Sequence, residues 1–117
     1  MDITLFRVDE NTHFTPFTPV IEPIGDSLSL TRTALDTENK NAFLGIWECT
    51  PGRWRRQVLQ AEYSYFLTGS GRFIHDSGEI VEFQAGDGIF FPKNSTGIWE
   101  IKHTVRKSYV IFKELKD

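Results

Sequence analysis

The feature that most constrains the fold is the close, even spacing of short β-type segments from about Asn41 onward. These segments are rich in Phe, Ile, Val, Tyr and Trp, which suit strands, and turn signals built from Gly, Pro, Asp or Asn separate them. No window in this region keeps a helical period. The pattern predicts an all-β antiparallel sandwich or barrel, with strands at 42–49, 62–68, 72–76, 79–84, 88–92, 97–102 and 107–113.

The first 40 residues are less regular. Residues 28–35 are apolar enough for a strand, whereas residues 36–40 (Asp-Thr-Glu-Asn-Lys) predict a polar, mobile link. We expect residues 1–40 to form strands and an arm that pack on a core made by residues 41–117. A chain of 117 residues is long enough to bury one core, so a single domain is predicted overall.

The net charge and the cysteine content limit the partners and the cellular compartment that the sequence suggests. The net charge of −3 argues against nucleic-acid binding, which depends on clustered positive charge, and we interpret the short basic run 52–56 as the segment leading into the strand at Glu62. The single cysteine, Cys49, excludes an internal disulfide and fits a reducing compartment. The N-terminal residues lack the apolar run of a signal peptide or membrane anchor. These observations predict a cytoplasmic protein with no nucleic-acid or membrane partner.

Two motif spacings resemble those of the cupin superfamily. Glu62 and Gly69 match the end of the first cupin motif, G-x5-H-x-H-x(3–4)-E-x6-G, and Gly86 and Pro92 match the start of the second, G-x5-P-x-G-x2-H-x3-N. The resemblance covers roughly residues 45–113. It implies an antiparallel double-stranded β-helix, the jelly-roll barrel of the cupins.

Further residues resemble one cupin subgroup, which includes ureidoglycine aminohydrolase and ethanolamine-utilisation cupins. They are Trp47, Trp99 and the run Val-Arg-Lys-Ser-Tyr at 105–109. Small cupins usually form homodimers, and the aromatic strand faces of Tyr63 and Tyr65 favour a homodimer here.

The histidines that hold the metal in cupins are missing from their positions. Counting back from Glu62, the two histidines of the first motif fall at residues 55 and 57 or at 56 and 58. The residues there are Arg55 and Gln57, or Arg56 and Val58, and Gly97 replaces the histidine of the second motif. A catalytic metal needs about three or four side-chain ligands. The sequence therefore predicts neither a metal nor another cofactor.

The family position of Glu62 predicts a site inside the barrel. If Glu62 points inward, strand alternation places Ser64 and Phe66 on the same side, and Gly97, Trp99 and Ile101 on one face. Gly97, in place of an imidazole, is expected to leave room beside Trp99. A buried carboxylate needs a companion, and the candidates are Arg55, Gln57, Lys107 and Tyr109. The predicted ligand-binding set is Glu62, Arg55, Gln57, Ser64, Phe66, Trp99 and Tyr109.

Three functions stay open from the sequence. The first is binding of a small metabolite that bears a carboxylate or an amine, because arginine grips carboxylates and Glu62 suits an amine. The second is catalysis: a metal-free acid–base isomerase or lyase that uses Glu62 with Tyr109 or Lys107, or the aminohydrolase-like activity that the resemblance implies and the missing histidines disfavour. The third is an interaction module. A barrel filled by Arg55, Phe66 and Trp99, or a structural ion pair of Glu62 with Arg55 or Lys107, would favour a non-catalytic protein.

Overall fold

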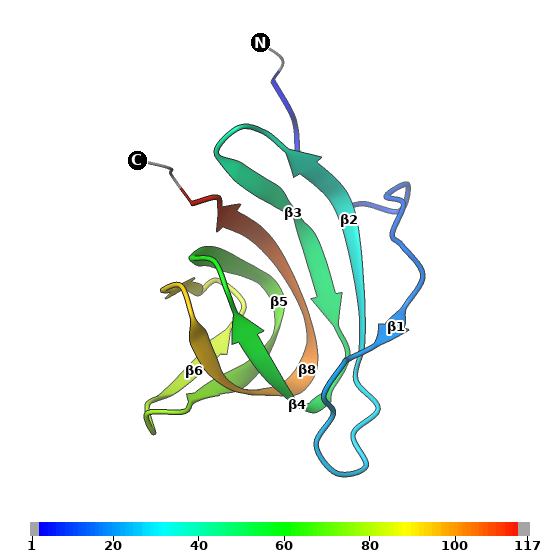
Figure 1. Ribbon diagram of the computed structural model, residues 1–117. Coiled ribbons are helices and arrows are strands. Elements are labelled where there is room, and N and C mark those ends of the chain that lie inside the picture. Colours follow the sequence, from blue (N-terminus) through cyan, green and yellow to red (C-terminus); the bar gives the residue numbers. More distant parts are fainter. Residues whose placement is uncertain (1–2, 115–117) are drawn as a thin grey trace.

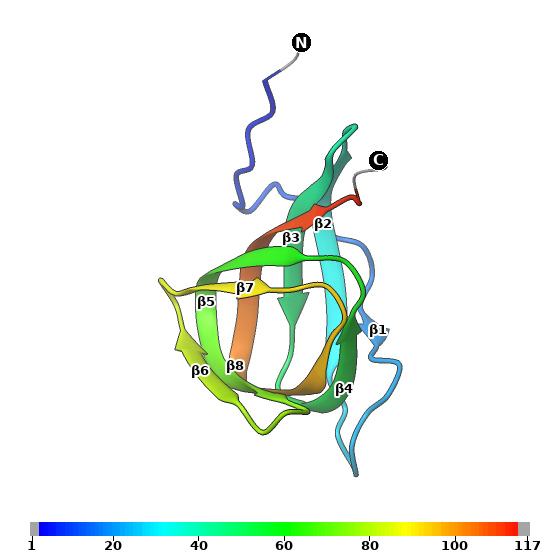
Figure 2. The same ribbon diagram turned by 60° about the vertical axis from the view of Figure 1, so that its left-hand side comes forward.

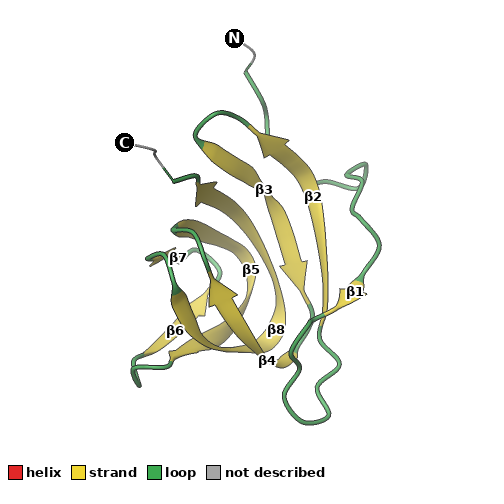
Figure 3. Cartoon of the chain, in the orientation of Figure 1, coloured by secondary structure: helices red, strands yellow, loops and turns green. Residues whose placement is uncertain are grey.

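All regular secondary structure within residues 3–114, the part of the chain that this computed structural model describes, is β-strand (Figure 3). In chain order the strands are β1 (Thr18–Pro19), β2 (Leu30–Glu38), β3 (Ala42–Cys49), β4 (Gly52–Val58), β5 (Glu62–His75), β6 (Ile80–Gln84), β7 (Gly88–Phe91) and β8 (Ser95–Phe112). Across these residues no helix is long and apolar enough to cross a membrane.

The strands form one antiparallel sheet that is organised around β8. The order along the sheet is β1-β2-β3-β8-β5-β6, while β4 also pairs with β8 and β7 also pairs with β5. The first half of β8 pairs with β4 and its second half pairs with β3, so the strand bends and belongs to both walls of the barrel (Figure 1). Figure 2 shows the closed ring of strands, with the β2–β3 hairpin extending beyond it. The predicted all-β, antiparallel jelly-roll fold is confirmed.

Two predicted breaks between strands are instead bends within long strands. The turn signal at 69–71 lies inside β5, and β8 joins the two separate strands predicted at 97–102 and 107–113. Gly69 has φ 89°, and a Cβ atom there would lie 2.7 Å from the Cα of Val105. Because β5 crosses so close to β8, its pairing register shifts here and only glycine fits.

The sequence prediction missed β4 and ended β2 too early. In β4, Trp54, Arg56 and Val58 face inward, while Arg53, Arg55 and Gln57 face outward. Because Arg56 is a charged residue on the inner face of β4, the sequence here lacks the alternation of apolar and polar residues by which a strand is recognised. The predicted polar link at 36–40 is wrong as far as Glu38, because β2 continues through a bulge between Ala34 and Thr37.

Aromatic side chains fill the interior of the barrel. Trp99 lies at the centre, with ring centroids of Phe66, Phe73, Phe83 and Phe91 between 5.1 and 6.3 Å from its own. A Cβ atom on Gly97 would lie 2.9 Å from the Phe73 ring. The expectation that Gly97 leaves room beside Trp99 is therefore wrong, because Phe73 occupies that space.

The segment before β2 follows the free edges of two strands. It pairs with β2 through a bridge between Phe14 and Ala34 and through β1, and with β4 through a bridge between Pro23 and Trp54. On the outer face of the sheet, the Arg32 guanidinium lies 4.1 Å from the Phe14 ring centroid. Residues 14–24 thus connect the edges of the two walls of the barrel.

Candidate functional site

Four polar side chains meet inside the barrel, and we refer to Glu62, Ser64, Arg56 and Lys107 as the Glu62 cluster. Glu62 is only 2% exposed. Its Oε2 accepts hydrogen bonds from Lys107 Nζ at 2.7 Å and Ser64 Oγ at 2.8 Å, and its Oε1 accepts one from Arg56 Nη2 at 3.0 Å. Three donors from three strands therefore satisfy one buried carboxylate.

Strand alternation and cross-strand pairing assemble the cluster. Glu62, Ser64 and Phe66 share the inner face of β5, as predicted, and Lys107 reaches Glu62 from the neighbouring β8. The Lys107 ammonium lies 4.6 Å from the ring centroid of Trp47 and 5.5 Å from that of Trp99. Indole faces attract cations, so the lysine is held between a carboxylate and two aromatic rings.

The electrostatics of the cluster act in opposite ways on its two most buried charges: they hold Glu62 ionised and bring Lys107 close to losing its proton. Burial on its own would raise the pKa of Glu62, but Lys107, Arg56 and the hydrogen bonds from Lys107 and Ser64 outweigh it, so this pKa lies below its usual value. Burial lowers the pKa of Lys107 to about 8, although Glu62 opposes that shift. Both groups are charged at neutral pH, with the lysine nearest to losing its proton.

The residues at the cupin metal positions do not fit a metal ion. The inward residues of β4 are Arg56 and Val58, and Gly97 stands opposite Arg56 in the pairing of β4 with β8. A guanidinium and an ammonium already bind the carboxylate of Glu62 and would repel a divalent cation. Within residues 3–114, no three His, Cys, Asp or Glu side chains gather as a metal site would require.

Three predicted companions of Glu62 lie elsewhere. Arg55 faces outward and donates to both oxygens of Asp76, at 3.1 and 2.9 Å. Gln57 is exposed on the same side of β4. Tyr109 donates to Asp36 at 3.0 Å, and burial raises the pKa of its phenol, an effect that the hydrogen bond to Asp36 adds to. The expectation that any of these three would pair with Glu62 is corrected.

Arg56 is the residue of the cluster that the sequence prediction passed over. The first motif allows two registers, 55 and 57 or 56 and 58, and the predicted companions Arg55 and Gln57 belong to the first of them. Trp54 and Val58, both buried, show that the even-numbered residues face inward. The apolar residues two positions before and two positions after Arg56 are the sequence signal that places its side chain on the inner face of the strand.

A groove opens beside the cluster, between β3 and β4. Its volume is about 640 Å³, and we call it the tryptophan groove. Segment 21–24, paired to the edge of β4, closes one side. The lining residues are Ile21, Glu22, Trp47, Trp54, Arg55, Arg56, Gln57 and Thr96. Arg56 therefore belongs both to the groove and to the Glu62 cluster.

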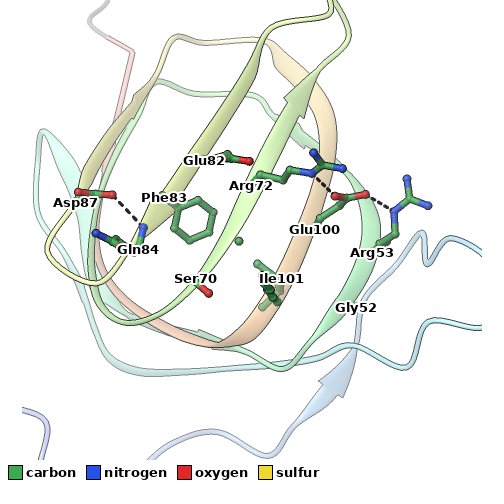
Figure 4. A pocket seen from close by; sticks show the side chains of 12 residues that line it. Gly52, Arg53, Ser70, Arg72, Glu82, Phe83, Gln84, Asp87, Glu100 and Ile101 are labelled. Carbon is green, nitrogen blue, oxygen red and sulfur yellow. Dashed lines mark hydrogen bonds and ion pairs between the residues drawn. The ribbon is translucent and has the colours of Figure 1, made fainter.

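A larger hollow, of about 870 Å³, shares no residue with the cluster. Figure 4 shows Phe83 and Ile101 at its floor and a charged row, Arg72–Glu100–Arg53, along one rim. Arg53 Nε binds one oxygen of Glu100 at 2.6 Å, and Arg72 Nε binds the other. The charged residues that line this hollow balance, with three cations and three carboxylates, whereas the tryptophan groove is lined by two arginines and one carboxylate, so the groove is the better candidate for an anionic ligand.

Comparisons with known proteins agree on the fold. The model of the EutQ-like cupin domain matches residues 37–109, whereas no curated protein matches the chain. The EutQ protein of Clostridium difficile is 23% identical, with a TM-score of 0.64 over 78% of this chain and 75% of its own.

Two further solved structures are similar. A DUF861 family protein of Thermotoga maritima is 28% identical, with a TM-score of 0.56 over 57% of this chain and 76% of its own. The polyketide cyclase RemF of Streptomyces resistomycificus is 22% identical, with a TM-score of 0.65 over 95% of this chain and 81% of its own. The part of the sequence resemblance that concerns ureidoglycine aminohydrolase stays a prediction.

Proposed function

This chain belongs to the EutQ-like cupin domain family, and on that premise we propose that it binds a small carboxylate-bearing metabolite in the tryptophan groove, without a resident metal. The cations of Arg56 and Lys107 take the place that a metal holds in other cupins. The cluster carries two positive charges and one negative charge, so it keeps a net positive charge of one. An anion is the ligand that this charge favours.

The observation that carries the proposal is the double role of Arg56. Its Nη2 is engaged by Glu62, while about 20% of the side chain is exposed. A guanidinium has five N–H donors in a planar fork, and the other donors of Arg56 have no hydrogen-bond partner among the described residues. That free edge suits a carboxylate, which it can bind through two parallel hydrogen bonds.

The filled interior moves the proposed site from inside the barrel to the groove. Glu62, Ser64, Phe66 and Trp99 are each at most 2% exposed, so they act on a ligand indirectly. Glu62 would orient Arg56, and Trp99 would support Trp47. Arg55 and Gln57 line the groove and stay proposed as direct contacts.

The proposal is tested by titrating acetate, propionate and benzoate into the protein in a calorimeter. We expect binding by the wild type and at least about tenfold weaker binding by Arg56→Gln, since losing a charged hydrogen-bonded contact costs roughly 1.5–3 kcal/mol. Arg53→Gln is the matched control, because Arg53 also lies on the outer face of β4 but is paired with Glu100 and lines the other hollow, not the groove. Carboxylate binding that Arg56→Gln leaves unchanged, or no binding at all, would reject the proposal.

A metal-free acid–base enzyme is the second candidate. It is favoured by Lys107, whose pKa of about 8 suits proton exchange near neutral pH, but Lys107 is 1% exposed and does not line the groove, so catalysis would require the wall beside Trp47 to open. Tyr109 is less suited to donate a proton, because its pKa is raised and its hydroxyl is bound to Asp36. Solvent exchange of the α-protons of a bound carboxylate in D₂O, followed by NMR and lost in Lys107→Met, would support catalysis.

We also propose a homodimer. Tyr63, Tyr65 and Phe90 leave a partly exposed aromatic area on the outer face of β5 and β7. Such areas often mark protein contacts. Light scattering coupled to size exclusion is expected to give twice the mass of the chain, and Tyr65→Lys is expected to lower it. If the area instead receives another protein, the wild type will elute as a monomer, which would count for the interaction module and against the homodimer.

A further inference from the structure

The tryptophan groove has a rigid aromatic wall. Trp47 on β3 and Trp54 on β4 have ring centroids 6.1 Å apart and planes tilted by 47°. Trp99 lies 6.3 Å behind Trp47, and the Lys107 ammonium lies 4.6 Å from the Trp47 ring. The indole of Trp47 is thus held in position by the core without any ligand. A preorganised wall loses little entropy on binding.

The charged residues of the groove favour a ligand that carries a single negative charge. Arg55 is neutralised by Asp76, whereas Arg56 offers its free edge. Glu22 lines the groove as well; within residues 3–114 its carboxylate makes no hydrogen bond or close ion pair, although its charge acts on nearby Arg55. Its backbone is fixed in place, since its carbonyl oxygen accepts a hydrogen bond from the Arg55 amide at 2.9 Å.

From these two features we infer that the ligand of the tryptophan groove is an aromatic monocarboxylate, with its ring against Trp47 and Trp54 and its carboxylate on Arg56. The inference rests on the proposed function and narrows it to one chemical class. A flat ring packs on indoles better than a puckered ring of similar size. The negative charge of Glu22 repels a second carboxylate on the ligand.

The ring preference is tested with benzoate and cyclohexanecarboxylate, which differ in planarity and aromatic character but share a carboxylate and a six-membered ring. We expect benzoate to bind the wild type about 2- to 12-fold more tightly, the range that corresponds to 0.5–1.5 kcal/mol for an aromatic pair. Trp47→Leu is expected to remove this preference. Because Trp47 also packs on the core, upfield ring-current shifts of the benzoate protons, measured by NMR in the wild type, supply a readout that does not depend on the variant.

The charge limit is tested with terephthalate and 4-methylbenzoate, which differ in a second carboxylate. We expect the wild type to bind 4-methylbenzoate at least about fivefold more tightly. Glu22→Gln, a change at an exposed side chain, is expected to bring the two affinities together.

The outcomes separate this inference from the proposed function. Equal affinity for benzoate and cyclohexanecarboxylate, with both lost in Arg56→Gln, would overturn the aromatic class and leave carboxylate binding standing. Terephthalate binding as tightly as 4-methylbenzoate in the wild type would overturn the limit to one charge. Failure of every carboxylate to bind would reject both.

Discussion

Replacing Glu62 by Gln is predicted to destabilise the protein by an amount that grows as the pH falls. In the wild type the carboxylate keeps Lys107 protonated although that lysine is only 1% exposed. In Glu62→Gln, Lys107 gives up its proton on folding, because burying an ammonium without a counter-charge costs more free energy than burying a neutral amine. Arg56 cannot respond in this way, since a guanidinium stays charged in proteins.

The magnitude follows from the pKa of Lys107. Its fall from 10.5 to about 8 means that folding with the proton in place costs roughly 3 kcal/mol, since each pKa unit corresponds to a little over 1 kcal/mol. Folding with a neutral Lys107 costs about 5 kcal/mol at pH 7 and about 6 kcal/mol at pH 6, because the unfolded chain must first release the proton. Through Lys107 the variant therefore loses roughly 1–2 kcal/mol at pH 7, about 3 kcal/mol at pH 6 and almost nothing at pH 8. The weakened hydrogen bond from Ser64 adds about 1 kcal/mol at every pH.

The sign is that of a lysine whose folded-state pKa lies below its unfolded-state pKa. The unfolded chain binds the proton more readily, so the stability of the variant rises with pH. Urea unfolding of the wild type and Glu62→Gln at pH 6, 7 and 8 measures the difference.

Glu48→Gln provides the control. Glu48 is also buried, but its partners are Arg32 and Arg106, so its loss leaves no lysine to deprotonate. A difference for Glu62→Gln as independent of pH as that for Glu48→Gln would refute the reasoning.

Three other changes have expected results. Gly97→Ala should cost at least about 1–3 kcal/mol in urea unfolding, because its Cβ would meet the backbone carbonyl of Ile74 on the paired strand as well as the Phe73 ring. An added Phe73→Leu should leave most of this loss in place, and full recovery would contradict the backbone contact. Tyr109→Phe should cost about 1 kcal/mol through its hydrogen bond to Asp36 and leave benzoate affinity unchanged, whereas weaker benzoate binding would move the site toward Tyr109. Burial raises the pKa of Cys49 to about 12, so its thiol should resist Ellman's reagent at pH 8 until urea unfolds the chain; rapid reaction in the folded protein would show that this part of the core opens.

The strand alternation that the sequence displays was enough to predict the inner face of β5 and β8. Glu62, Ser64 and Phe66 point inward, as do Trp99 and Ile101. These positions depend on a local period of two, which neighbouring residues reveal directly.

The partner of Glu62 on β4 could not be predicted in the same way. Choosing Arg56 over Arg55 needs the pairing register of β4 with β8, which joins residues about 40 positions apart in the chain. Register is fixed by which residues are buried once the whole sheet has formed. The filling of the space over Gly97 by Phe73 is likewise a contact between distant segments.

The central place of β8 has a consequence for how the protein folds. β3, β4 and β5 all precede β8 in the chain, and all three hydrogen-bond to it. Neither wall of the barrel is complete until Ser95–Phe112 has docked, so an early intermediate holding one finished wall is not available to this topology. Folding should therefore be slow for a chain of this length, because its decisive contacts are distant in sequence, and unfolding should be a single cooperative step.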